Sequence, residues 1–169
     1  MMFMFKKGSK VFYPYHGIGK IDDVFTREFG GKKEKYYSIN FVDENLKMMV
    51  PVDKADDLGL RKFLTEEEVE ALLEVLKKRA SEPREKDVDR SYFLHMIGSL
   101  DIFDVAKGVC ELLCKRETTG LKRDEDELLK RGIDILNGLI VCSKKVKPAE
   151  ARKMIIDYWK KGLNKKKKS

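Results

Sequence analysis

The sequence predicts an α+β fold in which a small antiparallel β-barrel is followed by an all-helical domain of about five helices. Residues 1–53 predict the β part, because aromatic and β-branched residues there are interrupted by Gly and Pro. From Thr65 onwards, apolar residues instead recur at helical spacing. With 169 residues and 42% hydrophobic content, the chain has enough apolar material for one domain or two small ones.

The strands are predicted from alternation along the sequence. In the run KYYSINF at residues 35–41, Tyr37, Ile39 and Phe41 alternate with Ser38 and Asn40. In the run LKMMVPV at residues 46–52, period two puts Leu46, Met48, Val50 and Val52 on one face and Lys47 and Met49 on the other. We therefore expect Met48 in the core and Met49 exposed on the opposite face. A glycine pair at residues 30–31 predicts the turn before the first run. Short antiparallel strands of this kind usually curl into a small barrel.

The helical region opens with Thr65 and Glu68 at the spacing of a capping box. Helices are predicted over residues 65–79, 87–98, 101–116 and 124–143, with a last helix from Pro148. The helix at 124–143 is apolar on two sides, so we expect it near the centre of the bundle. Trp159 lies at packing spacing in the last helix and is expected to be a core residue.

The net charge of +7 is mostly a property of the C-terminus. The last ten residues, KKGLNKKKKS, carry six lysines and no acid, which leaves +1 for residues 1–159. Such a segment attracts phosphate, or it is a disordered terminus that improves solubility. Charge alone therefore does not assign nucleic-acid binding to the rest of the chain.

Cysteine and histidine usage does not favour a metal site. Cys110 and Cys114 lie one helical turn apart and Cys142 is alone, so we expect buried free thiols. His16, in the run YPYHGIG, could be a general base, but a tight turn between strands is the favoured interpretation. No apolar run approaches the roughly 20 residues of a membrane span, and no signal-peptide pattern is present, so a cytosolic protein is expected.

The opening FKKGSKVFYPYHGIGKI, residues 5–21, resembles the start of the CarD/CdnL family of bacterial transcription regulators. The polymerase-interacting module of the transcription-repair coupling factor shares this pattern. Further on, LKMMVPVDKADDLGLRKFL at residues 46–64 resembles the family's Leu-x-x-x-Val-Pro followed by Gly-hydrophobic-Arg. The resemblance continues into the helical half, with Glu-Pro at 82–83, Gly-Leu at 120–121 and a tryptophan in the last helix.

This resemblance implies a Tudor-like barrel at residues 1–60 that binds the β subunit of RNA polymerase. It implies a helical domain at residues 64–163 that contacts promoter DNA at the upstream edge of the bubble and so stabilises the open complex. A lysine-rich tail at residues 164–169 follows. The implied protein is a bacterial monomer in the cytoplasm, associated with the nucleoid through polymerase. The resemblance implies no catalytic activity, no cofactor and no metal.

The resemblance also implies which residues contact the polymerase. Arg27 matches a family arginine with that role. Met49 stands where many members have a second contacting arginine, so this chain lacks one charge there. Leu46 and Lys47, just before it, are expected to support the contact.

The expected DNA contact differs from that of the family. The tryptophan that the family wedges into the minor groove falls on Lys86, which reaches phosphates but cannot insert between bases as an indole does. We expect a weaker electrostatic contact from Arg84, Lys86, Arg90, Lys122 and Arg123. The alternative is a protein-only adaptor, in which the helical domain binds another protein and the lysine tail is the sole nucleic-acid contact.

Overall fold

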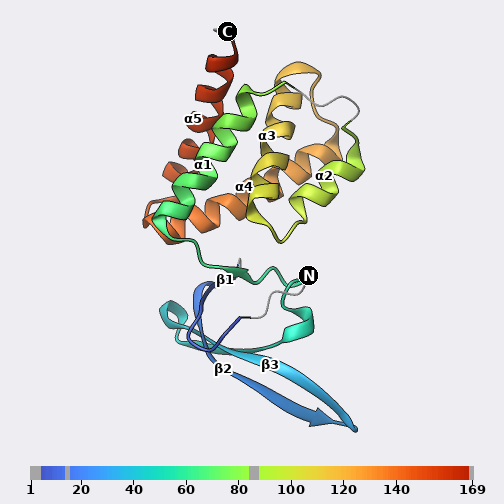
Figure 1. Ribbon diagram of the computed structural model, residues 1–169, viewed down its shortest axis with the longest axis vertical. Coiled ribbons are helices and arrows are strands. Elements are labelled where there is room, and N and C mark those ends of the chain that lie inside the picture. The colour runs from blue at the N-terminus through green and yellow to red at the C-terminus, as the bar shows by residue number, and fades with distance from the viewer. Residues whose placement is uncertain (1–4, 14–15, 84–87, 168–169) are drawn as a thin grey trace. The chain divides into compact units, whose positions relative to one another are not determined.

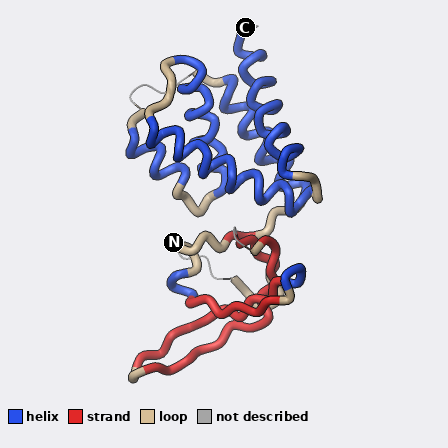
Figure 2. Tube along the Cα trace, turned by 180° about the vertical axis from the view of Figure 1, so that it is seen from behind, coloured by secondary structure: helices blue, strands red, loops and turns tan. Residues whose placement is uncertain are grey.

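The computed structural model describes residues 5–13, 16–83 and 88–167. The chain divides into two compact units, Met1–Phe63 and Leu64–Ser169. The first unit is a β-sheet and the second is a helical bundle, as Figure 1 and the strand and helix colours of Figure 2 show. The predicted α+β class is therefore confirmed. Among the described residues, no helix combines the length and the apolar character needed to cross a membrane.

The N-terminal unit is built on one antiparallel sheet. Its strands are β1 (Lys10–Tyr13), β2 (Gly17–Phe29), β3 (Lys32–Phe41), β4 (Leu46–Pro51) and β5 (Arg61–Lys62), and two short 3₁₀ helices are η1 (Val42–Glu44) and η2 (Val52–Lys54). The strand order is β4-β3-β2-β1-β5, and within the described residues no ladder joins β4 to β5. The sheet is therefore not closed into a complete barrel, but its five antiparallel strands are compatible with the small barrel that the sequence predicts.

One face of this sheet packs on a small core. Its most buried members include Val11, Ile21, Tyr37, Ile39 and Phe41, each at most 1% exposed. Gly19 faces this core, and a Cβ there would lie 2.6 Å from Cγ2 of Ile39 and 2.8 Å from Cε1 of Phe41. Close packing therefore requires Gly19, whereas Gly17, with φ of +77°, allows the turn from β1 to β2. Because β1 ends at Tyr13 and β2 begins at Gly17, the run YPYHGIG joins two strands, as predicted, while Pro14 and Tyr15 themselves lie outside the described residues.

The described residues of the C-terminal unit form five helices, as the sequence predicted. They are α1 (Glu66–Ser81), α2 (Arg90–Ile97), α3 (Ile102–Thr118), α4 (Arg123–Lys144) and α5 (Pro148–Lys167). The predicted capping box is present at the start of α1. The backbone N–H of Glu68 donates to Oγ1 of Thr65, and the backbone N–H of Thr65 donates to Oε1 of Glu68, both at 3.2 Å. Because α5 continues to Lys167, the first residues of the predicted tail are helical.

The centre of the bundle is shared by α3 and α4. Nine of the 17 residues of α3 are buried, against eight of the 22 in α4, which contacts the other four helices. Trp159 is 2% exposed, and its Nε1–H donates to Sγ of Cys114 at 3.3 Å, so the predicted core position is confirmed. Cys110 and Cys114 are buried free thiols, also as predicted, whereas Cys142 is half-buried.

Candidate functional site

A long exposed part of the N-terminal unit is the outer half of the β2–β3 hairpin, residues 25–36, which we call the arm. Every residue from Thr26 to Lys35 is exposed. Figure 1 shows β2 and β3 running side by side beyond the rest of the sheet. The tip turns at Gly30 and Gly31, whose φ angles of +56° and +80° favour glycine. The arm therefore presents side chains to solvent rather than to a core.

Cross-strand pairing sorts the arm's side chains onto two faces, because directly opposite residues of an antiparallel pair share a face. Three such pairs alternate along one face: Phe25 with Tyr36, Arg27 with Glu34, and Phe29 with Lys32. The other face carries the intervening pairs, among them Glu28 with Lys33. The first face thus carries all the aromatic side chains of the arm.

The side chains of this first face contact one another. The rings of Phe25 and Tyr36 are stacked, with centroids 5.8 Å apart, and the guanidinium of Arg27 lies 5.4 Å from the Phe25 centroid. The Tyr36 hydroxyl donates to Oε2 of Glu34 at 2.8 Å, and this hydrogen bond raises the pKa of Tyr36. The hydroxyl therefore stays protonated at neutral pH and remains a donor. An exposed arginine is thus held on an aromatic platform.

The same face continues across β3 onto β4. Ser38 and Asn40, which follow Tyr36 on alternate positions, pair with Met49 and Lys47. Met49 is 53% exposed, as predicted. We call the surface formed by Phe25, Arg27, Phe29, Tyr36, Lys47 and Met49 the outer face.

Three of the four residues expected to contact polymerase therefore lie on the outer face, and Leu46 does not. Leu46 is half-buried and packs against the core on the opposite side of β4, as does Met48. Its structural role is to hold β4 on the core beneath Lys47 and Met49. Sequence reasoning missed Phe29, which is 62% exposed at the arm's tip. The signal was available, because Phe25, Arg27 and Phe29 alternate in the sequence.

The side chain of His16 contacts Glu44 and Tyr13 and so has a structural role in the sheet unit. Its Nδ1 lies 2.6 Å from Oε2 of Glu44, and its ring stacks on Tyr13 with centroids 5.5 Å apart. These contacts tie the β1–β2 turn to η1. Among the described residues, no three His, Cys, Asp or Glu side chains are grouped as metal ligands.

In the helical unit, three of the predicted DNA-contacting residues come together where α2 and α4 begin. Nε of Arg90 lies 3.2 Å from Oδ2 of Asp124, in the first turn of α4, directly after Lys122 and Arg123. The side chains of Arg90 and Arg123 are 68% and 95% exposed. Arg84 and Lys86 lie outside the described residues. We call Arg90, Lys122 and Arg123 the cation cluster.

Carboxylates are interspersed with this cluster. Nε of Arg123 lies 3.7 Å from Oε1 of Glu127, and the buried Glu125 accepts hydrogen bonds from the Lys115 ammonium and the backbone N–H of Lys122. Burial raises the pKa of Glu125, but these two hydrogen bonds and the positive charges of Lys115 and Lys122 together outweigh burial, so the pKa is lowered. Glu125 is therefore ionised at neutral pH. The cation cluster thus lacks the strong positive field of a uniformly basic surface.

Comparison with known proteins bears on the N-terminal unit. Residues 5–64 match the family model of the CarD-like/TRCF RID domain. A Bacillus subtilis (strain 168) protein with the name "Putative transcription factor YdeB" is 34% identical to this chain over 58 residues. The matched segment is 34% of this chain and 38% of that protein, so it spans well under half of either.

Proposed function

Because residues 5–64 form a CarD-like domain, we propose that this chain is a transcription factor that binds the β subunit of RNA polymerase through its outer face. The supporting observation is that the family match includes an exposed arginine fixed on an aromatic platform. Arginine, aromatic residues and methionine are the residue types enriched at the centres of protein interfaces. The outer face has all three, with Met49 and Phe29 exposed beside Arg27.

Preorganisation makes Arg27 the residue on which this binding most depends. Stacking on Phe25 restricts the guanidinium before the partner arrives, so less side-chain entropy is lost on binding. The two charges that flank it on this face, Glu34 and Lys32, have opposite sign. The partner surface should therefore present an acidic group to Arg27 and apolar atoms to Phe29 and Met49.

The helical unit completes the proposal by contacting promoter DNA at the upstream edge of the bubble. The cation cluster would bind backbone phosphates there and stabilise the open complex. Polymerase binding raises the effective concentration of the helical unit near the DNA, so each contact can be weak. Stabilising the open state by about 1.4 kcal/mol would change its population about tenfold.

The adaptor alternative has one specific observation in its favour. Arg90 and Arg123 each lie close to a carboxylate, so the helical unit offers DNA little net positive charge. Deleting residues 165–169 separates the two proposals, and it spares Gly162, which packs against Lys77 and Ala80 of α1. If the variant that lacks residues 165–169 still binds forked promoter DNA, the rest of the helical unit contacts DNA. Complete loss supports the adaptor, with the tail as the sole nucleic-acid contact.

The polymerase proposal is tested by pull-down of the full chain with the β subunit of RNA polymerase. Arg27→Glu should weaken binding about tenfold or more, because a charge at an interface centre is reversed. Lys33→Glu is a matched control, since it also creates a like-charge pair across the arm, with Glu28, but on the opposite face. Equal effects of the two variants would contradict the proposal.

The DNA proposal needs its own variant, read out as the lifetime of the open complex. Arg90→Gln combined with Arg123→Gln should shorten that lifetime while leaving polymerase binding unchanged. Arg152→Gln combined with Lys153→Gln removes the same charge from exposed positions of α5 and should leave the lifetime as it is. An unaltered lifetime in the first pair would favour the adaptor.

A further inference from the structure

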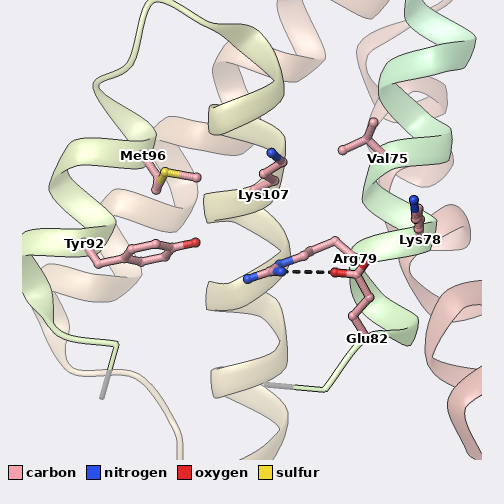
Figure 3. A pocket seen from close by; sticks show the side chains of 7 residues that line it. All are labelled: Val75, Lys78, Arg79, Glu82, Tyr92, Met96 and Lys107. Carbon is pink, nitrogen blue, oxygen red and sulfur yellow. Dashed lines mark hydrogen bonds and ion pairs between the residues drawn. The ribbon is translucent and has the colours of Figure 1, made fainter. Parts of the chain in front are cut away.

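The helical unit contains an open cavity of about 450 Å³ bordered by α1, α2 and α3. Figure 3 shows its side chains, with Lys78 and Arg79 on α1, Tyr92 and Met96 on α2, and Lys107 on α3. Cavities of this size hold small molecules. The polymerase-binding proposal does not use this cavity, and none of its lining residues belongs to the cation cluster.

One wall of the cavity is fixed by Arg79. Its Nε–H donates to Oε1 of Glu111 at 2.9 Å and its Nη1 donates to Oε2 of Glu82 at 3.1 Å. The Glu111 side chain is 4% exposed and that of Arg79 is 17% exposed, so this ion pair joins α1 to α3 inside the bundle. Since two carboxylates already balance Arg79, its charge is not available to a ligand.

The two lysines differ from Arg79 in this respect. Within the part of the chain that the structure describes, neither the Lys78 nor the Lys107 ammonium forms a hydrogen bond or an ion pair. They belong to different helices and border the same cavity (Figure 3). Two ammonium groups that have no such partner among the described residues favour an anion in the recess that they border, and phosphate oxygens accept such donors well.

The α2 side of the cavity has a different character. Tyr92 contributes an aromatic ring and Met96 a thioether, both suited to packing against a planar ring. Gly108 of α3 allows α2 to come this close, because a Cβ there would lie 2.9 Å from Cβ of Met96. The cavity thus combines a cationic rim with an aromatic and apolar wall on a second helix.

We propose that this cavity binds a small molecule that carries both a phosphate group and a planar ring, which is the chemistry of a nucleoside phosphate. The phosphate lies between Lys78 and Lys107, and the ring packs on Tyr92 and Met96. A recess of about 450 Å³ accommodates most of such a molecule, whereas a duplex could place only a phosphate at its mouth.

The test is an NMR titration of the ¹⁵N-labelled full chain with adenosine 5′-monophosphate. Amide signals of residues around Tyr92, Met96 and Lys107 should shift, and those of the C-terminal lysines should not. Adenosine alone and inorganic phosphate alone should each bind about tenfold more weakly, because each engages only one wall. Saturable shifts confined to the C-terminal lysines would overturn the proposal.

Matched double variants show which lysines matter. Lys78→Gln with Lys107→Gln should weaken binding of adenosine 5′-monophosphate about tenfold or more, because two charge-assisted contacts are lost. Lys153→Gln with Lys160→Gln removes the same charge from exposed positions of α5 and should leave the affinity unchanged. Equal weakening in the two double variants would mean non-specific attraction and overturn the proposal. Full displacement of the nucleotide by a short DNA duplex would assign the lysines to DNA and also overturn it.

Discussion

The two units use arginine in opposite ways. In the sheet unit, Arg27 lies exposed over the Phe25 ring and opposite Glu34 on the arm. In the helical unit, Arg79 donates to a carboxylate, Glu111, that is almost completely buried between α1 and α3. The comparison teaches that an arginine whose contacting side chain is buried stabilises the fold, whereas one whose contacts are exposed remains open to solvent. Arg79 serves the fold, whereas Arg27 is available to a partner molecule.

The largest expected effect comes from removing the buried pair. Arg79→Ala leaves the Glu111 carboxylate buried without its partner and should lower the free energy of unfolding by about 3–5 kcal/mol. Urea denaturation followed by circular dichroism measures this. Arg79→Met combined with Glu111→Leu should restore most of the loss, because no unpaired charge remains buried and the side chain of the other partner, Glu82, is partly exposed to solvent. A loss below about 1 kcal/mol for Arg79→Ala would remove the distinction between the two arginines.

Glu125, the second buried carboxylate with cationic partners, should show the next effect. At neutral pH, Glu125→Gln should cost about 1.5–3 kcal/mol, because the charged hydrogen bond from Lys115 is lost. The pKa of Glu125 is lower in the folded chain than its ordinary value of 4.5. Its stabilisation is therefore present above pH 4.5 and is lost as the pH falls through the lowered value. The difference between wild type and variant should shrink over that window in urea titrations, and a constant difference would contradict this.

A cap on an exposed helix end should give an intermediate effect. Thr65→Ala removes the side-chain oxygen that accepts from the Glu68 backbone, and should lower the free energy of unfolding by about 1 kcal/mol. Thr119→Ala, at the exposed end of α3, is the control and should change it by less than about 0.5 kcal/mol. Similar changes in the free energy of unfolding for the two variants would mean that the capping box contributes no stability.

The smallest effect on stability is expected for the exposed arginine itself. Arg27→Ala removes a solvent-exposed contact with Phe25 and should change the free energy of unfolding by about 0.5 kcal/mol. Thermal and urea unfolding of the full chain measure this change. A loss as large as that of Arg79→Ala would show that the arm, too, depends on its arginine for folding.

Local signals in the sequence predicted most of the secondary structure. The Thr65–Glu68 spacing predicted the start of α1, and the alternation at residues 46–52 predicted that Met49 would be exposed and Met48 would contact the core. Alternation does not say whether the edges of a sheet pair. The predicted barrel is therefore matched in its antiparallel strands but not in its closure, because the two-residue strand β5 pairs with β1 and no ladder joins it to β4 among the described residues.

The parts that the sequence did not reveal depend on contacts between distant residues. Arg79 and Glu111 are 32 positions apart, and no local pattern marks them as a pair. Gly19 was interpreted as a turn residue, but it is required by the ring of Phe41 on another strand. The cavity likewise needs three helices to be assembled before Lys78 and Lys107 border one recess.

Because the arm is built from cross-strand pairs, its length can change without changing the face on which the tip side chains lie. Each cross-strand pair adds about 3.4 Å, and successive pairs point to alternate sides. Removing two neighbouring pairs would shorten the arm by about 7 Å and leave Phe29 on its original side. Removing one pair would instead turn the tip over, so that Phe29 would exchange sides with Glu28. The length of the hairpin can therefore be changed two cross-strand pairs at a time, in evolution or by design, while the tip side chains stay on the same face.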